Sequence, residues 1–144
     1  MDAKIGKLLE DKPAALVTIE PRAQVMDAVR LMNQHHIGSV LVMEATQVRG
    51  IFTERDVLTR VVAMARDPTQ TRVDEVMTRE LVTVTPETTV RVVMQLMTER
   101  RFRHVPVLHD GAVIAILSIG DLTRWISRDQ RRTIDDLTDY VRAG

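Results

Sequence analysis

The amino-acid sequence has no cysteine, only four aromatic residues and no excess of charge of either sign. The absence of cysteine excludes disulfide bonds and thiolate chemistry. Four aromatic side chains are too few for the stacking platforms that bind single-stranded nucleic acids. Twenty basic residues balance twenty acidic ones, so the chain lacks the basic surface of general nucleic-acid or membrane-surface binders. We therefore expect neither a nucleic-acid nor a membrane partner.

Long apolar runs are also missing. No run approaches the roughly 20 apolar residues of a membrane-spanning helix. Residues 1–12 carry charges of both signs where a signal peptide would have its apolar core. The expected location is therefore the cytoplasm. Apolar residues make up 44% of the 144 residues, which is ample for the core of one domain, or of two small domains that need each other.

The sequence contains an internal repeat with a constant offset of 65 residues, the distance from Gly50 to Ala115. The segment 50–56 (GIFTERD) matches 115–121 (AILSIGD). Both are an apolar run followed by a hydroxyl residue, two variable positions and an aspartate. The segment 17–21 (VTIEP) likewise matches 82–86 (VTVTP), and no insertion or deletion separates the copies. We expect two structurally equivalent halves.

Each copy predicts the same order of elements. Apolar residues at positions i, i+3, i+4 and i+7 from Val25 indicate an amphipathic helix, and the same stripe recurs from Val90. In the second copy, residues 109–111 (HDG) predict a tight hairpin turn. In the first copy, strands are expected at 16–19, 40–43 and 48–52, and a second helix at 53–66. Each copy therefore reads strand–helix–strand–strand–helix.

The predicted fold class is α/β. Each half alone leaves an apolar face uncovered, so we expect two β-α-β-β-α repeats related by a pseudo-twofold axis and packed through their sheets. The one linker-like segment contains Asp67 and Pro68. The predicted boundaries are a first domain at 5–66, a linker with a short helical lead-in at 67–76, a second domain at 77–127 and a C-terminal amphipathic helix at 128–144.

The repeated tetrad, Thr53-x-x-Asp56 and Ser118-x-x-Asp121, lies where a strand is expected to enter a helix. The hydroxyl then stands at the helix start and the aspartate one turn in. Backbone N–H groups and the positive end of the helix dipole attract phosphate. A carboxylate can accept hydrogen bonds from both vicinal hydroxyls of a ribose. This arrangement suits a phosphorylated ribose.

The same tetrad also has a structural interpretation. Thr53 and Asp56 are a variant of the capping box, with Asp in place of Glu or Gln. For a single tetrad the cap is the favoured interpretation, because Ser and Thr so often cap helices. The presence of two copies in the same phase strengthens the ligand interpretation, although a duplication would copy a cap as well. The two roles are compatible, because a capped helix start can still face a ligand.

The repeated tetrad, together with residues 103–107 (RHVPV), resembles a tandem pair of cystathionine-β-synthase (CBS) domains, the Bateman module. The resemblance covers residues 5–126, and the chain is similar to a stand-alone bacterial CBS-pair protein. It implies a regulatory, non-catalytic sensor of an adenosine nucleotide, with AMP as the first expectation and ADP, ATP, NAD or S-adenosylmethionine as alternatives. It also implies a disc-like homodimer that signals to a downstream protein through its conformation.

The resemblance assigns roles by position. It implies that Asp56 and Asp121 contact ribose, that Thr53 and Ser118 contact phosphate or ribose, and that main chain at 18–19 and 83–84 frames the adenine. The pair Arg103-His104 is assigned to phosphate. The full set expected to bind the nucleotide is Thr18, Ile19, Thr53, Arg55, Asp56, Thr83, Val84, Arg103, His104, Pro106, Ser118 and Asp121.

The first copy departs from the family pattern beside this site. Gly38 and Ser39 occupy the positions of Arg103 and His104, and Leu41 replaces Pro106. We therefore expect two clefts of unequal affinity.

No residues support catalysis or a metal centre. The sequence has no nucleophile–base pair, phosphate-cradling glycine loop or zinc-hydrolase motif, so no enzymatic activity is expected. His35 and His36 are adjacent and would point about 100° apart on a helix, and no set of metal ligands surrounds them. The alternative to a nucleotide sensor is a protein-interaction scaffold with unoccupied clefts.

Apolar residues on the helices after each tetrad suggest self-association. Val57, Val61, Trp125 and Ile126 add to a C-terminal stripe that includes Leu137 and Val141. This is more apolar surface than two small repeats are expected to cover. We predict a twofold-symmetric homodimer built largely on these helices.

Overall fold

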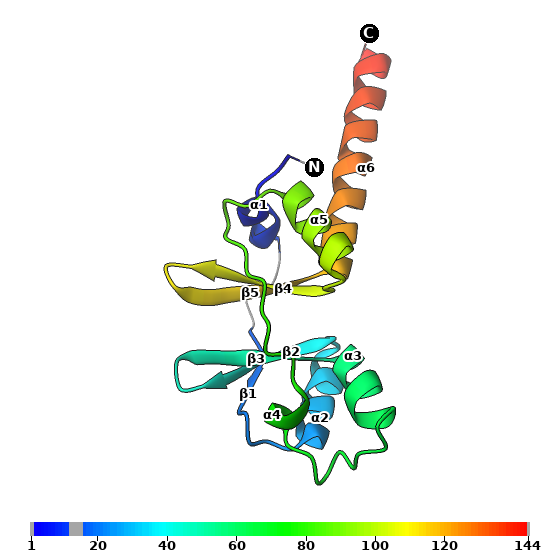
Figure 1. Cartoon of the computed structure of the whole chain (residues 1–144). Coiled ribbons are helices and arrows are strands. Elements are labelled where there is room, and N and C mark those ends of the chain that lie inside the picture. The colour runs from blue at the N-terminus through cyan, green and yellow to red at the C-terminus, as the bar shows by residue number, and fades with distance from the viewer. Residues whose placement is uncertain (1, 12–15, 144) are drawn as a thin grey trace. The chain divides into compact units, whose positions relative to one another are not determined.

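A computed structural model describes residues 2–11 and 16–143, and the side chains up to Arg131 (Figure 1). The chain divides into two compact units. The first-repeat unit comprises residues 15–82, and the second-repeat unit comprises residues 1–14 and 83–144. Each unit combines a small sheet with helices, as the predicted α/β class requires.

The first-repeat unit contains a three-stranded sheet in the order β1-β2-β3. Strand β1 runs parallel to β2, and β2 runs antiparallel to β3. Its elements are β1 (Thr18–Ile19), α2 (Val25–His35), β2 (Ser39–Glu44), β3 (Gln47–Thr53), α3 (Glu54–Asp56), the π-helix η1 (Val57–Val62) and α4 (Val73–Val76). The strand–helix–strand–strand–helix order predicted for this copy is confirmed.

The second-repeat unit repeats this order with one strand fewer. Strands β4 and β5 form an antiparallel hairpin whose turn residues, Asp110 and Gly111, both have positive φ, as its Asp-Gly sequence predicts. The elements are α1 (Ile5–Glu10), α5 (Val90–Arg100), β4 (His104–His109), β5 (Ala112–Ser118) and α6 (Ile119–Ala143). Helices α2 and α5, and the paired hairpins, keep the 65-residue offset.

The first strand expected in the second copy, where residues 82–86 match 17–21, is reduced to one parallel bridge between Val84 and Val107. In the first-repeat unit, Leu41 N donates to Val17 O at 3.1 Å and joins β1 to β2. The equivalent residue of the second copy is Pro106, which has no N–H to donate. One substitution between the copies thus accounts for the missing strand.

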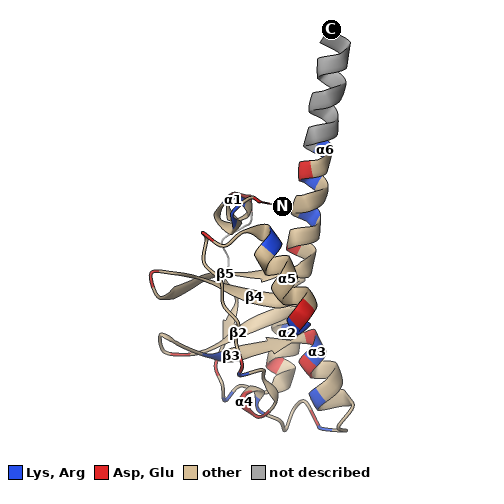
Figure 2. Cartoon of the chain, turned by 45° about the horizontal axis from the view of Figure 1, so that its top comes forward, with Lys and Arg blue, Asp and Glu red and all other residues tan. Residues whose placement is uncertain are grey.

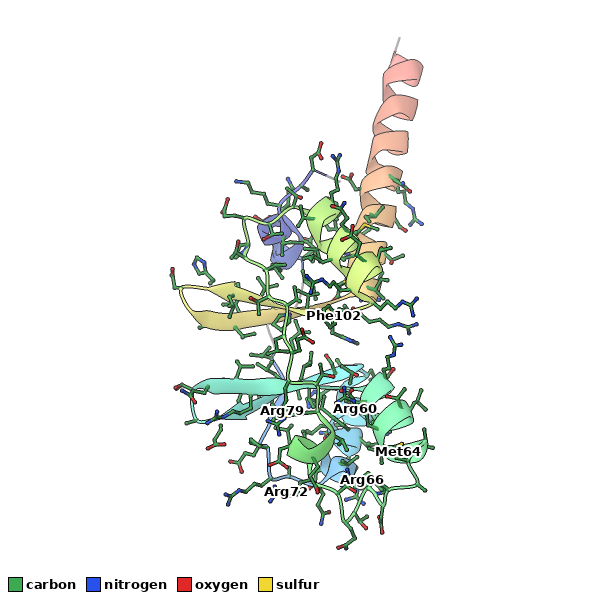
Figure 3. The ribbon with its side chains drawn as sticks, in the orientation of Figure 1. Arg60, Met64, Arg66, Arg72, Arg79 and Phe102 are labelled. Atoms are coloured by element: carbon green, nitrogen blue, oxygen red, sulfur yellow. The ribbon has the colours of Figure 1, made fainter. Side chains whose placement is uncertain are left out.

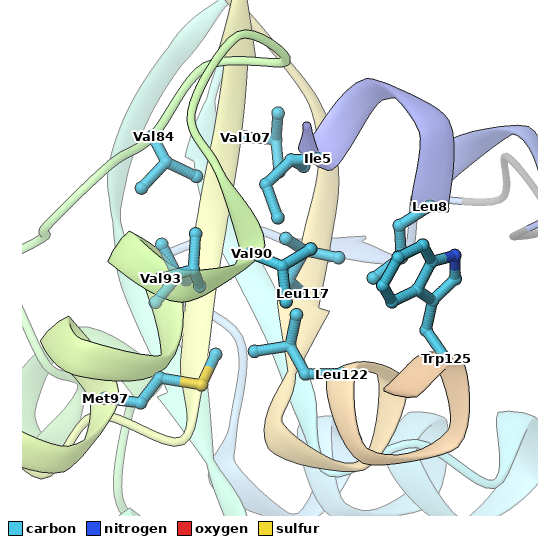
Figure 4. Close-up of a cluster of buried hydrophobic side chains, with 11 residues drawn as sticks. Ile5, Leu8, Val84, Val90, Val93, Met97, Val107, Leu117, Leu122 and Trp125 are labelled. Carbon is cyan, nitrogen blue, oxygen red and sulfur yellow. The ribbon is translucent and has the colours of Figure 1, made fainter. Parts of the chain in front are cut away.

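Each unit has its own hydrophobic core. In the first-repeat unit, the predicted stripe of α2 packs on Val40, Val42 and Phe52 of the hairpin, which are fully buried. In the second-repeat unit, the stripe of α5 packs on the β4–β5 hairpin and on Leu122 and Trp125 of α6 (Figure 4). The periodicity in the sequence therefore identifies the buried faces correctly.

The short helices α1 and α4 each complete the core of the repeat that they do not directly precede. Ile5 N donates to Thr88 O at 2.8 Å, and the equivalent Val73 N donates to Ala23 O at 2.8 Å. Leu8 of α1 lies beside Trp125 in the second-repeat core (Figure 4). Residues 5–11, expected in the first domain, lie in the second-repeat unit. Residues 67–76, expected to be a linker, and residues 77–82, expected in the second domain, lie in the first-repeat unit. Apolar spacing marks a helix but does not indicate which repeat it covers.

The two helices that follow the tetrads differ from prediction. The first widens into η1, where Ala63 N donates to Leu58 O, five residues back. It stops before Pro68, which cannot continue a helix. The second runs without interruption as α6 from Ile119 to Ala143. Its equivalent of Pro68 is Thr133, so the separate helix predicted at 128–144 is the continuation of the tetrad helix.

The predicted dimer residues are in part core residues. Val61 is 1% exposed and Trp125 is 8% exposed, each within the core of its own unit. Val57 and Ile126 pack against those cores. The side chains of Leu137 and Val141 lie outside the described residues. The apolar surface that is exposed after the first tetrad belongs instead to Leu58, Val62 and Met64.

Candidate functional site

The first tetrad forms a complete capping box at the start of α3. Thr53 has extended backbone, and its Oγ1 accepts a hydrogen bond from Asp56 N at 3.2 Å. In return, Thr53 N donates to Asp56 Oδ2 at 3.1 Å. The side chain of Asp56 is only 6% exposed. The structural role considered for this tetrad is therefore real, and one carboxylate oxygen is committed to it.

The second tetrad has the same geometry at the start of α6. Asp121 N donates to Ser118 Oγ at 3.0 Å, and Ser118 N donates to Asp121 Oδ2 at 2.8 Å. The Asp121 side chain is 14% exposed. Both copies thus place a hydroxyl and a carboxylate at a helix start, directly after a strand. A cap of this kind still leaves the outward carboxylate oxygen to other donors.

The second oxygen of each carboxylate accepts from residues that the sequence analysis did not select. Asp56 Oδ1 accepts from Thr78 Oγ1 at 3.0 Å and lies 3.5 Å from Arg60 Nε. Asp121 Oδ1 accepts from Arg124 Nη2 at 2.8 Å. The arginines follow their aspartates by four and three residues, a spacing that marks neighbours on a helix. Thr78 is 22 residues from Asp56, and no local pattern connects them.

The segments expected to frame the adenine each lie beside the first strand of a hairpin, β2 in the first-repeat unit and β4 in the second. Thr18 and Ile19 form β1, which pairs with Leu41 and Val42 of β2. In the second-repeat unit, Val84 N donates to Pro106 O at 3.1 Å, and Leu108 N donates to Val84 O at 2.8 Å. Thr18 and Thr83 are exposed, whereas Val84 and Pro106 are buried. The two segments take equivalent places beside their hairpins.

The basic pair of the second copy lies beside its tetrad. His104 pairs with Ser118 in the β4–β5 register, and Arg103 O accepts from Ile119 N at 2.9 Å. Arg103 is exposed and His104 half-buried. Ser118, Asp121, Arg103 and His104 are thus brought together at one helix start.

The first copy has the same backbone arrangement but lacks the basic pair that Arg103 and His104 form in the second copy. Ser39 pairs with Thr53, and Gly38 O accepts from Glu54 N at 3.0 Å. Arg55 is exposed in the first turn of α3. The departure noted in the sequence therefore changes side chains and leaves the frame intact.

Charged residues are distributed over helices and turns of both units, with basic and acidic positions interspersed (Figure 2). Within the described part of the chain, no group of three or more His, Cys, Asp or Glu residues could hold a metal ion. His36 is the C-cap of α2, with φ of 53°. None of the helices in residues 2–11 and 16–143 combines the length and apolar character needed to span a bilayer.

Comparison with known proteins identifies the family. The CBS domain model matches residues 13–63 and 73–128. The chain is 42% identical over 125 residues to the mitochondrial CBS domain-containing protein CBSX3 of Arabidopsis thaliana, covering 83% of this chain and 61% of that protein. It is 35% identical over 107 residues to the CBS domain-containing protein YhcV of Bacillus subtilis, covering 74% of this chain and 76% of that one.

Solved structures agree with this assignment. A putative signal-transduction protein with CBS domains from Burkholderia ambifaria has 38% sequence identity and a TM-score of 0.86, with 89% of this chain and 96% of that chain covered. A hexameric CBS-CP12 protein from bloom-forming cyanobacteria has 31% identity and a TM-score of 0.75, with coverages of 85% and 67%. The matched segments contain both tetrads, so the chain belongs to the CBS-domain family and carries two CBS repeats.

Proposed function

We propose that this CBS pair is a regulatory, non-catalytic sensor that binds an adenosine nucleotide and acts through ligand-dependent conformation. The observation that carries the proposal is the second tetrad, where a hydroxyl, a carboxylate and two basic residues meet at one helix start. Such a site offers a carboxylate to the ribose, and N–H groups and cations to phosphate. The residues of the site include no activated nucleophile, so we assign it to binding.

AMP is the first ligand proposed, with ADP, ATP, NAD and S-adenosylmethionine as the other candidates. Arg103 is exposed and next to the helix start, which suits a single phosphate held by charge-assisted hydrogen bonds. The first tetrad has no cation at the equivalent positions. We therefore propose that the second tetrad binds the nucleotide more tightly than the first.

Titration calorimetry with the five candidate ligands tests the proposal. At least one adenosine compound is expected to bind without being converted, and Asp121→Asn is expected to weaken it. Thr98→Val is the matched control, because Thr98 Oγ1 bonds only within α5, to Met94 O at 2.9 Å. Absence of binding by all five ligands would overturn the proposal, and turnover of any of them would overturn its non-catalytic part.

The second candidate function is a protein-interaction scaffold whose clefts stay empty. The engagement of both carboxylates in capping boxes favours it, because the tetrads then have a sufficient structural role. If the calorimetric titrations show no binding while Asp121→Asn lowers the melting temperature, the scaffold becomes the better conclusion.

A homodimer is part of the proposed function. Leu58, Val62 and Met64 are 63%, 63% and 68% exposed after the first tetrad, and Figure 3 labels Met64. Grouped apolar side chains that are this exposed in a single chain are typical of a surface that a partner subunit covers. Light scattering of Leu58→Lys with Val62→Lys is expected to show a monomer where the wild type is a dimer. We propose a cytoplasmic location, although CBSX3 is described as mitochondrial.

A further inference from the structure

The first tetrad is held by a segment that leads out of its own unit. Thr78 Oγ1 lies 3.0 Å from Asp56 Oδ1 and 3.2 Å from Asp56 Oδ2. Thr78 also exchanges two backbone hydrogen bonds of 2.9 Å with Ile51 of β3. Four residues later the unit ends, at Val82. Thr78 thus connects the carboxylate to the start of the connector between the units.

Two further features keep Thr78 in place. Gly50 allows the close approach, because a Cβ at this position would lie 2.6 Å from Thr78 O. Arg60, labelled in Figure 3, donates from Nη1 to Met77 O at 3.0 Å while its Nε lies 3.5 Å from Asp56 Oδ1. The carboxylate, the arginine and the segment 77–78 therefore form one connected network within the first-repeat unit.

We propose that the Thr78 hydroxyl is a latch that a ribose must displace from Asp56. This inference rests on the proposed function. The two oxygens of Asp56 already accept from Thr53 N and Thr78 Oγ1, and its side chain is 6% exposed. A ribose diol needs the acceptor sites of the same carboxylate. Thr53 N belongs to the helix cap, and Arg60 Nε lies 3.5 Å from Oδ1, an ion-pair distance that is longer than a typical hydrogen bond. Thr78, whose hydroxyl bonds the carboxylate from outside the helix, is therefore the donor that yields.

The exchange connects ligand binding to the connector. When ribose hydroxyls replace Thr78 Oγ1, the segment 77–78 loses its side-chain bond to the carboxylate and retains its backbone pairing with Ile51 and the bond from Arg60 Nη1 to Met77 O. Occupancy of the first tetrad therefore loosens the chain that leads to the second-repeat unit. Thr78 acts through Asp56 as a positioning residue.

Thr78→Val tests the latch, because it removes the hydroxyl and keeps the shape. The experiment is done in an Asp121→Asn background, so that AMP binding reports the first tetrad. Thr78→Val is expected to bind AMP about 3- to 10-fold more tightly, the effect of one hydrogen bond that no longer has to be broken. The folding equilibrium constant of the same variant is expected to fall by the same factor, because its folded state lacks the hydrogen bond to Asp56.

The control ligand is 2′,3′-dideoxy-AMP, whose affinity is expected to be unchanged by Thr78→Val. Thr59→Val is the control variant, since Thr59 Oγ1 donates only within its helix, to Arg55 O at 2.8 Å. If wild type binds AMP but Thr78→Val binds it equally or more weakly, the latch is wrong and the sensor function stands. If neither protein binds any adenosine compound, the sensor function fails and the latch fails with it.

A measurement on the protein without the Thr78 substitution covers the case in which Thr78→Val does not fold. Hydrogen exchange of the Thr78 and Ile51 amides, which bond each other's carbonyls at 2.9 Å, is compared with and without AMP. Faster exchange with AMP in the Asp121→Asn background is expected. Slower exchange there would show that the ligand tightens this segment, which contradicts displacement.

Discussion

The two repeats share one backbone template and differ in how each covers its tetrad. Both have a strand, a capping box and a helix in the same register. In the first copy, the backbone of Thr78 pairs with Ile51 of β3, and the Thr78 side chain bonds the carboxylate. In the second copy, basic side chains stand beside the helix start. Four of the equivalent pairs that differ bear on this coverage: Gly38 and Arg103, Ser39 and His104, Leu41 and Pro106, and Gly50 and Ala115.

The two copies therefore share the backbone of the hairpin and of the helix start, and differ in the residues beside them. Leu41 supplies an N–H that orders β1, and Gly50 leaves room for Thr78. Pro106 removes the first interaction, and Ala115 already carries the Cβ that Gly50 lacks. A carboxylate that is covered by a side-chain hydroxyl, as Asp56 is by Thr78, is suited to exchanging that hydroxyl for those of a ligand. A repeat that carries exposed cations is suited to attracting one.

The largest expected effect is on AMP affinity and concerns Arg103, a charge that the second tetrad has beside it and the first tetrad lacks. If Arg103 contacts the phosphate, Arg103→Ala weakens AMP binding by roughly 10- to 150-fold, the equivalent of about 1.5–3 kcal/mol. Adenosine, which lacks the phosphate, is expected to bind almost unchanged. Asp121→Asn weakens AMP and adenosine by similar factors, because both carry the ribose. Calorimetry with both ligands and both variants measures the difference.

An equal loss of AMP and adenosine affinity in Arg103→Ala would contradict the phosphate role. Ser39→His with Gly38→Arg provides the reverse test, because it places the basic pair on the first repeat. AMP affinity at the first tetrad, measured in an Asp121→Asn background, is expected to rise.

The second prediction concerns the close approach at Gly50. Gly50→Ala is expected to destabilise the protein by about 1–3 kcal/mol, because the added methyl overlaps Thr78 O and the Met77 side chain. The control is Ala115→Gly, which changes the equivalent position in the opposite direction and is expected to cost about 0.5–1 kcal/mol through backbone entropy. Urea denaturation compares them. A Gly50→Ala protein as stable as the wild type would mean that the segment moves away at no cost.

Much of this arrangement could be predicted from the sequence. The stripes from Val25 and Val90 locate the buried helix faces, and the tetrads locate the two helix starts, because both depend on local spacing. The roles of α1 and α4 could not be predicted, since either short helix could complete either core. Thr78 was missed for the same reason. Its partner is distant in sequence, and only tertiary pairing with Ile51 brings them together.

The third prediction concerns why the first tetrad helix stops. Ala65 has φ of 54°, a conformation that costs an L-residue about 1 kcal/mol and costs glycine almost nothing. Ala65→Gly is therefore expected to stabilise the protein by about 0.5–1 kcal/mol. Two residues earlier, Ala63 has φ of −63°, so Ala63→Gly is expected to destabilise it by a similar amount. Thermal or urea denaturation gives both values, and the same sign for both would contradict the backbone assignment.

The smallest effect concerns how α1 and α4 are attached. Lys4 Nζ lies 2.6 Å from Glu87 Oε2 and connects the start of α1 to the rest of the second-repeat unit. The equivalent positions in the first-repeat unit are Arg72 and Arg22, which have like charges, and Arg72 pairs with Asp74 instead, at 3.0 Å. The hydrogen bond with Lys4 lowers the pKa of the Glu87 carboxyl, and the same bond raises the pKa of Lys4.

The pH dependence of this pair follows from the two directions. Because the pKa of Glu87 is lowered on folding, its contribution is present above the ordinary value of 4.5 and is lost as the pH falls through the folded pKa. Because the pKa of Lys4 is raised, its contribution is present below 10.5 and is lost as the pH rises through the folded pKa. Both side chains are largely exposed to solvent, so the effect is small and is screened by salt.

Lys4→Met is therefore expected to lower the stability slightly at pH 7 and low salt, and to match the wild type below the folded pKa of Glu87. The difference should also shrink in 1 M salt, where the Debye length is about 3 Å. Arg72→Met tests the attachment of α4, where the carboxylate partner is on the same helix. It should leave the hold of α4 on the first repeat almost unchanged, since that hold depends on backbone bonds such as Val73 N to Ala23 O. If Arg72→Met destabilised the protein more than Lys4→Met, side-chain charge would matter more at α4 than at α1. That result would contradict the claim that backbone bonds attach α4 while an ion pair contributes at α1.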